Sequence, residues 1–271
     1  GRVGGDTERM QGVGPTLENV LNFREMGGLP AADGGTVRAG VLYRSGHWSE
    51  ASDADVVALA GLGLATIVDF RAAVDRRGDG GENRNPDGPD YLPMEISDTS
   101  GRGHEIRSVL MSDDQSLIDE RFGDGRAEAL ARDGVVQMVL EAEKQEVFAR
   151  FLDVVAAPER RPVLWHCSAG KDRAGWAATL VGIALGVPDD ALVEHYLESN
   201  VHRPFEQRVA HYAAKGLDVT SMVPFMRVDE TYIRAGFEAI DSGWPSREAY
   251  LADALGFGPE RIAALRAELV V

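Results

Sequence analysis

Short apolar runs alternate with turn residues over the first third of the chain. The segment 22–46 carries brief β-like runs separated by Gly and Asp-Gly turn signals, which predicts a hairpin and edge strands. A helix is expected over 52–63, with Ser52 as its N-cap and Asp55 as the capping-box partner. The continuous apolar run 64–70 is typical of a buried parallel strand.

The middle of the chain is more polar. Residues 74–90 predict a long loop, and a candidate strand follows at 91–96. Residues 97–125 are polar and rich in glycine, so we expect mobility there. The amphipathic pattern over 126–157 predicts one or two helices. They lead into an apolar strand that ends at His166.

Helical patterns dominate the remainder of the chain, and prolines stand at or near several of their starts. The predicted helices are 173–186, 189–200, 204–215, 229–241, 246–255 and 259–269. Strands early and late with helices between them predict an α/β fold, with a central, mainly parallel sheet flanked by helices and a helical C-terminal half. We expect a loose segment over 1–15 and a single domain over 16–271.

The charge and hydrophobicity of the chain limit the kinds of molecule that it is expected to bind. The 271 residues carry a formal net charge of −16, which disfavours nucleic acids and anionic membranes as partners but leaves an anionic substrate open. The longest apolar stretch, 174–187, is too short to cross a bilayer, and the start lacks a signal-peptide pattern. We therefore expect a cytoplasmic or secreted protein, with its oligomeric state open. The six histidines show no ligand spacing, so neither a metal nor a cofactor is expected.

The single cysteine stands in the sequence HCSAGKDR, which is the turn between the strand ending at His166 and the helix predicted from Arg173. The backbone N–H groups of such a turn and of a helix N-terminus lack partners, and together they form a cradle for a phosphate-sized anion. Gly170 lets the backbone bend close to a ligand, and the planar guanidinium of Arg173 matches two phosphate oxygens. The same positive field favours the thiolate form of Cys167, which makes it a nucleophile.

A buried, inert cysteine is the simpler alternative, because free cysteines are often structural. The pattern His-Cys-x-x-Gly-x-x-Arg arises by accident in this composition with a probability of roughly 2 in 10,000. It also lies in the strand–turn–helix context that phosphate chemistry requires. The pattern therefore favours a catalytic cysteine.

The HCSAGKDR segment resembles the HC-x5-R loop of the cysteine-dependent protein tyrosine and dual-specificity phosphatases. Its GKDR form is similar to the bacterial PtpB-like group, which acts on phosphotyrosine and, in some members, on phosphoinositides. The segments NFREMGGL, VLYRSG, LGLATIVDFR and HYLESN resemble landmarks of that group in the same order. The resemblance covers roughly residues 17–270 and implies a protein tyrosine phosphatase-like fold.

The resemblance implies a role for each loop residue. Cys167 would be the nucleophile and Arg173 the phosphate clamp. The backbone amides of the loop would bind phosphate, and they belong to Ser168, Ala169, Gly170, Lys171, Asp172 and Arg173. His166 would orient the loop, as a structural histidine or with a direct electrostatic role, and Arg44 is a further supporting residue.

A leaving tyrosyl oxygen needs a proton, so a carboxylic acid must face the cradle. Asp69 is the first candidate, because it ends a buried strand and ligands gather at the carboxyl ends of strands in open α/β sheets. The alternative is a structural aspartate that pairs with Arg71 or Arg44. Asp98, which follows the strand predicted at 91–96, is the second candidate.

Two charged loop residues bear on the substrate. Asp172 should repel a bound anion unless its side chain points outward, so we expect it to orient Arg173, Arg44 or another basic neighbour, or to contact the substrate. Lys171 is either a solvated charge or a contact to a second phosphate or an acidic group of the substrate. The second interpretation keeps phosphoinositides among the candidate substrates.

The segment 203–230 places Phe205, Val209 and Tyr212 on one helical face. The resemblance implies a helical lid over the active site in this region, and ordinary core packing explains the same stripe equally well.

The sequence thus predicts a protein tyrosine phosphatase with a phosphocysteine intermediate, either strict or of dual specificity. The alternatives are a phosphoinositide phosphatase and a weakly active or inactive phosphatase that only binds phosphoproteins. Intact Cys167 and Arg173 argue against the inactive form.

Ala174 follows the loop arginine, where many members of the resembled family have Ser or Thr. That hydroxyl helps to stabilise the thiolate and to break down the phosphoenzyme. We therefore predict slow hydrolysis of the intermediate, seen in rapid-mixing kinetics as a burst of released phenol before a slower steady state. Fast turnover without a burst would contradict this.

Overall fold

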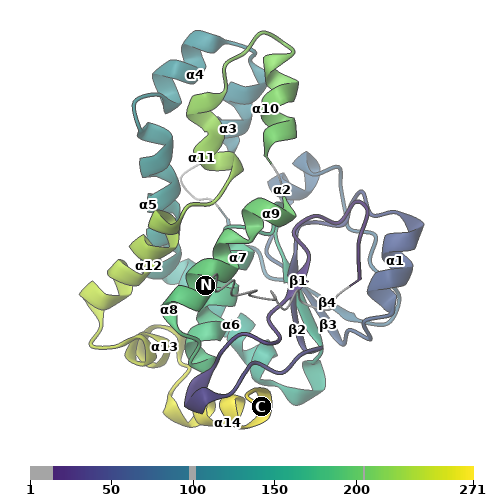
Figure 1. Cartoon of the computed structure of the whole chain (residues 1–271), viewed down its shortest axis with the longest axis vertical. Helices are drawn as coiled ribbons and strands as arrows, with labels where there is room; N and C mark the ends of the chain where they lie inside the picture. Colours follow the sequence, from purple (N-terminus) through teal and green to yellow (C-terminus); the bar gives the residue numbers. More distant parts are fainter. Residues whose placement is uncertain (1–14, 98–101, 204) are drawn as a thin grey trace, which may run out of the picture.

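One five-stranded sheet lies at the centre of the computed structural model, which describes residues 15–97, 102–203 and 205–271 (Figure 1). The strand order is β1-β2-β5-β3-β4, and only β1 runs antiparallel to its neighbour. The strands are β1 Arg24–Glu25, β2 Leu42–Ser45, β3 Thr66–Asp69, β4 Asp90–Pro93 and β5 Val163–His166. The α/β fold with a mainly parallel sheet is therefore confirmed. The predicted 1–15 segment falls almost wholly outside the described residues.

The register of the parallel strands brings their carboxyl ends to one edge of the sheet. His166 at the end of β5 pairs with Ser45 on one side and with Asp69 on the other, and Asp69 pairs with Pro93. The chain segments that leave these strands therefore meet at a single edge, where ligands of open α/β sheets bind.

Both faces of the sheet are covered, because the central strands are apolar on both sides. Alternate residues of β2, β3 and β5 face the larger core, which the helices of the C-terminal half complete, and they are Leu42, Val68, Val163 and Trp165. The residues between them face a smaller core that includes Leu59 of α1 (Asp53–Ala60), and they are Tyr43, Ile67 and Leu164. Packing on both faces thus fixes the strands, and with them the carboxyl ends that form the edge described above.

The helices of the C-terminal half follow the predicted pattern closely. They are α7 Arg173–Leu185, α8 Asp189–Leu197, α9 Ser199–His202, α10 Glu206–Ala213, α11 Val223–Met226, α12 Glu230–Gly243, α13 Arg247–Leu255 and α14 Pro259–Leu269. The predicted helix 189–200 is divided into α8 and α9. The pattern over 126–157 forms two helices, α5 Arg126–Leu140 and α6 Ala142–Ala156.

Three short helices lie where loops or irregular chain were expected. They are α2 Ala73–Gly78, α3 Arg102–Met111 and α4 Gln115–Phe122. In α2 the carboxylate of Asp75 accepts a hydrogen bond from the backbone N–H of Ala72, 3.0 Å away, which closes the first turn. Helices this short depend on such local contacts and on packing, so they leave little periodic signal in the sequence.

The predicted capping box of α1 is confirmed, and its acidic member also fixes the N-terminal chain. Asp55 accepts hydrogen bonds from the backbone N–H groups of Ser52, Glu18 and Asn19. Burial alone would raise the pKa of Asp55, but these three donors outweigh it and lower the pKa. The carboxylate is therefore charged at neutral pH, and the segment before β1 is anchored to α1.

The segment 205–226 belongs to a separate helical cluster. Figure 1 shows α10 and α11 beside α3 and α4, above the sheet. The cluster has its own apolar core, formed by Val109, Ile118, Phe122, Ala127, Leu217, Val219, Met222 and Met226. Phe205, Val209 and Tyr212 pack against this core, so their stripe serves packing between helices.

Each helix in the described ranges is either too short or too polar to span a bilayer.

Candidate active site

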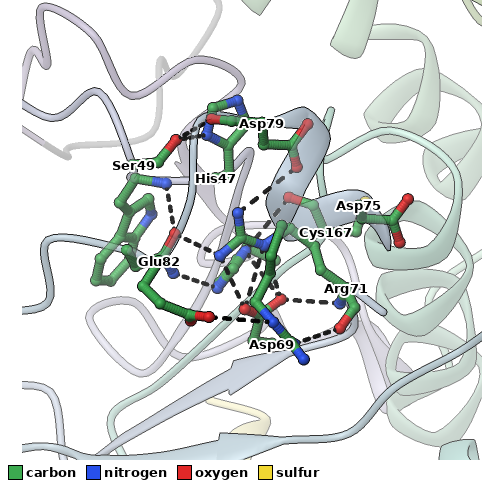
Figure 2. Close-up of polar contacts among 12 residues, drawn as sticks. His47, Ser49, Asp69, Arg71, Asp75, Asp79, Glu82 and Cys167 are labelled. Atoms are coloured by element: carbon green, nitrogen blue, oxygen red, sulfur yellow. Dashed lines mark hydrogen bonds and ion pairs between the residues drawn. The ribbon is translucent and has the colours of Figure 1, made fainter. Parts of the chain in front are cut away.

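Cys167 lies at the carboxyl edge of the sheet, directly after β5, and Arg173 begins α7 six residues later. The thiol is buried, with 2% of the residue exposed. Figure 2 labels Cys167 together with Asp69, Arg71 and Asp75. The loop between Cys167 and Arg173 thus occupies the place that the sequence predicted for a phosphate cradle.

The carbonyl groups of this loop are held by donors outside it. The carbonyl of Ser168 accepts a hydrogen bond from the backbone N–H of His47 at 3.1 Å. The carbonyl of Ala169 accepts one from the side-chain amide of Asn22 at 3.1 Å. In a trans peptide the C=O and the following N–H point in opposite directions. These two carbonyls therefore direct the next N–H groups toward the interior of the loop.

Arg44 holds the second half of the loop in the same way. Its Nη2 donates to the carbonyls of Gly170 and Lys171, at 2.7 and 3.3 Å. Arg44 is fully buried, and desolvation lowers its pKa to about 10, against the opposing effect of Cys167 and other acidic groups. A guanidinium of that pKa is charged at pH 7, so Arg44 adds a buried positive charge beneath the loop.

Gly170 is required by the close approach of two chain segments. Its φ of +70° lies in the left-handed region that favours glycine. A Cβ at this position would lie 2.4 Å from the carbonyl carbon and oxygen of Ser45. The loop therefore rests directly on the backbone at the end of β2.

Arg173 is fixed by a carboxylate that the sequence analysis did not identify. Its Nη1 donates to Asp75 of α2 at 2.6 Å, and to the carbonyls of Phe70 and Ile96, both at 3.2 Å. Burial disfavours the charge, but Cys167 and Asp75 outweigh it and raise the pKa of Arg173. Within the part of the chain that the structure describes, these hydrogen bonds all fall on Nη1. The planar fork of a guanidinium can also hold two phosphate oxygens, which is the part that the sequence predicted for Arg173.

His166 is neutral, and its hydrogen bonds show which nitrogen carries the proton. The side-chain oxygen of Asn83 accepts from the N–H of Trp48 and from Arg71, which leaves the amide nitrogen facing His166 Nε2 at 2.8 Å. Nε2 is therefore the acceptor, and Nδ1 carries the hydrogen, 3.3 Å from the carbonyl of Cys167. Burial lowers the pKa of His166 to about 4, against the effect of Asp69. His166 thus orients the loop without adding charge.

The partners of Asp69 disfavour the role of general acid that the sequence predicted for it. Asp69 and Arg71 are both fully buried and form an ion pair at 3.0 Å (Figure 2). Tyr91 donates a further hydrogen bond to this carboxylate at 2.6 Å. Burial favours the protonated acid, but His166, Arg71 and Tyr91 outweigh it and lower the pKa of Asp69. A carboxyl group that is ionised and enclosed by donors does not suit proton delivery, so the structural pairing with Arg71 is favoured.

Lys171 and Asp172 pair with each other at the rim of the loop, with Nζ and Oδ2 2.8 Å apart. The Lys171 side chain is 10% exposed and that of Asp172 is 48% exposed. Asp172 therefore points outward, as its charge requires, and its basic partner is Lys171 rather than Arg173 or Arg44.

Arg203 is a further cation near the thiol that the sequence analysis did not consider. It follows α9, and its Nη1 donates a long hydrogen bond of 3.4 Å to the carbonyl of Met226. Burial lowers the pKa of Arg203, while Asp172 and Cys167 act in the opposite direction across the site. Arg203 thus lies within electrostatic range of Cys167.

Comparison with known proteins agrees with this geometry. A family model described as the tyrosine phosphatase family matches residues 15–271. A protein of Cupriavidus necator, whose name assigns it to the tyrosine-protein phosphatases, is 34% identical over 245 residues, covering 88% of this chain and 83% of the relative. The triple specificity protein phosphatase PtpB of Mycobacterium tuberculosis is 29% identical over 265 residues, covering 88% of this chain and 92% of the relative.

Replacing Gly170 with alanine should disrupt anion binding, because the new Cβ would meet the backbone of Ser45 at a left-handed φ. Strain of about 1–3 kcal/mol is expected there, which corresponds to a loss of tungstate affinity of roughly 5- to 150-fold in calorimetry. The matched control is Gly134→Ala on α5, where a Cβ meets open space. The control should keep the affinity of the wild type, and an equal effect of the two substitutions would contradict the argument.

Proposed function

The chain belongs to the tyrosine phosphatase family, and from that premise we propose that it hydrolyses phosphotyrosine monoesters through a phosphocysteine on Cys167. The observation that carries the proposal is the inward direction of the loop amides around a buried thiol, with Arg173 fixed at the entrance. Such an array of donors stabilises the charge that develops on a transferring phosphoryl group.

The reaction takes place in two steps. The thiolate of Cys167 attacks phosphorus, an S–P bond forms, and the P–O bond to the tyrosyl oxygen breaks. That oxygen leaves with the bonding electron pair and takes a proton from the general acid. Water then attacks phosphorus while the resulting carboxylate accepts its proton. The S–P bond breaks, inorganic phosphate is released, and the thiolate is restored.

Asp98 is the proposed general acid. It lies outside the described residues, but Ile96, two positions earlier, accepts a hydrogen bond from Arg173. The chain that leads to Asp98 therefore passes the phosphate clamp. The role of Asp69 is then to fix Arg71 and His166 beneath the loop.

A phosphoinositide phosphatase acting at the same site is the second candidate. Lys171 and Arg203 place two cations near the cradle, where a second phosphate on the substrate would find opposite charge. An acidic side chain next to phosphotyrosine would suit the same cations. Dual specificity, which adds phosphoserine and phosphothreonine to the substrates, is part of the same proposal, and an inactive phosphate-binding protein is the outcome if turnover is absent.

The helical cluster that includes 205–226 is proposed to act as a lid over this site. Its support is the position of Arg203, which precedes α10 and lies within electrostatic range of Cys167. The apolar core shared with α3, α4 and α5 would let the cluster move as one unit.

Hydrolysis of para-nitrophenyl phosphate by the wild type and by Cys167→Ser tests the proposal. We expect turnover in the presence of a chelator, lost by at least about 10³-fold in the variant because the nucleophile is gone. Loss of wild-type activity with the chelator would contradict the cysteine mechanism. Binding of tungstate without turnover would indicate the inactive form. Comparing phosphotyrosyl peptides with soluble inositol phosphates then separates the two substrate classes.

The pH dependence of phosphotyrosyl peptide hydrolysis identifies the acid. An acid must be protonated when the tyrosyl oxygen leaves, so turnover falls as the pH rises through its pKa. Asp98→Asn should remove this alkaline limb and lower kcat by about 10²-fold or more. Asp69→Asn should keep the limb and lower Tm instead.

The effect of Asp69→Asn on Tm has its own pH dependence. Because the pKa of Asp69 is lowered on folding, the stabilising effect of its carboxylate is present above roughly pH 4 and is lost as the pH falls through the pKa of the folded state.

An alkaline limb that survives in Asp98→Asn and vanishes in Asp69→Asn would assign the general acid to Asp69 instead of Asp98.

A further inference from the structure

Asn22, which precedes β1, is buried and forms hydrogen bonds in three directions. The residue is 1% exposed, and its φ of +59° is left-handed. Its backbone N–H donates to the carbonyl of His202 at the end of α9, at 3.1 Å. Its side-chain nitrogen donates to the carbonyl of Ala169 in the phosphate loop, and its side-chain oxygen accepts from Arg24 Nη1. Asn22 thus connects β1, the C-terminal end of α9 and the phosphate loop through its hydrogen bonds.

The orientation of the Asn22 amide is determined by Arg24. A guanidinium only donates hydrogen bonds, so the atom of Asn22 that faces Arg24 is the oxygen. The nitrogen must then face the carbonyl of Ala169. Arg24 is itself fixed, because its Nη2 donates to the carbonyl of His195 and to the hydroxyl of Ser199, at 2.9 and 3.0 Å. The direction of the Asn22 donor is therefore imposed by α8 and α9.

The carbonyl of Ala169 belongs to the peptide unit that ends at Gly170. Gly170 provides its other half, and glycine restricts the backbone least. Among the described residues, Asn22 is the one hydrogen-bond donor to this carbonyl. If the peptide rotated, a carbonyl oxygen would replace the N–H of Gly170 inside the cradle and would repel both the thiolate and the phosphate.

We propose that Asn22 is a positioning residue of the phosphate loop, which holds the Ala169–Gly170 peptide with its N–H toward the bound phosphate. The proposal rests on the proposed function, because it assigns the loop to phosphate. Asparagine suits the position for two reasons: it adopts a left-handed φ more readily than other side chains, and its amide can both accept from Arg24 and donate to Ala169. Aspartate would have no hydrogen to donate.

Two variants remove the donor in different ways. Asn22→Gly keeps the left-handed backbone and the N–H to His202 but lacks the side chain. Asn22→Asp keeps the size of the side chain and its acceptor for Arg24, but it turns an oxygen toward the carbonyl of Ala169. If one variant fails to fold, the other still tests the donor.

The readouts are tungstate affinity by calorimetry and the pH profile of kcat/KM. Loss of one inward donor typically costs about 10²–10³-fold in kcat. Asn22 acts on such a donor indirectly, so we expect roughly a tenfold loss of tungstate affinity in Asn22→Gly and a larger one in Asn22→Asp. The acidic limb of the profile should move to higher pH in both variants, because a carbonyl oxygen turned into the cradle disfavours negative charge there.

Asn200→Ala is the matched control. Asn200 lies on α9 and connects it to Val228 with two hydrogen bonds of 2.9 and 2.8 Å, without contacting the phosphate loop. Its loss should lower Tm while tungstate affinity and the acidic limb stay as in the wild type. A purely structural Asn22 would behave in the same way.

The outcomes separate this proposal from the proposed function. If Asn22→Gly and Asn22→Asp lower Tm but keep the affinity and the limb of the wild type, the positioning role is wrong. If the wild type binds tungstate without turnover and both variants weaken that binding, the positioning role holds and the proposed function fails. A wild type that does not bind tungstate would overturn both.

Discussion

The outward direction of five consecutive carbonyl groups is the constraint on which the site depends. A loop can present its N–H groups to an anion only if its carbonyls have partners elsewhere, because each peptide fixes the two in opposite directions. Here the partners are supplied by the segments around β1 and β2 and by His166. Arg44 donates to two of these carbonyls and places a buried positive charge beneath the loop.

The loop itself was predictable because its elements are contiguous. A cysteine and an arginine separated by five residues, between a short apolar run and a helical pattern, define the turn without any knowledge of tertiary contacts. The partners of the loop left no such local signal. Asn22 and Ala169 lie 147 positions apart, and Asp75 belongs to a helix too short to be recognised by periodicity.

Asp69 illustrates a limit of reasoning from strand ends. Its place at the end of the apolar run 64–70 correctly put it at the carboxyl edge of the sheet, directly opposite His166 of β5. Position along a strand does not determine the partner of a side chain, however. The carboxylate of Asp69 forms an ion pair with Arg71, two residues later, and accepts a hydrogen bond from Tyr91 of the adjacent strand. The sheet edge therefore carries two charge systems, one in which Asp69 pairs with Arg71 and one in which Arg173 pairs with Asp75.

The distribution of carbonyl partners also has a consequence for folding. Local chain propensity can form the β5–α7 turn early, but the donors to its carbonyls include Asn22 and Arg44, far away in the sequence. Thr36 and Val271, which are also far apart in the sequence, exchange backbone hydrogen bonds. Contacts of such long sequence separation form late. An isolated fragment around HCSAGKDR would therefore contain the reactive residues without the shape that makes them a catalyst.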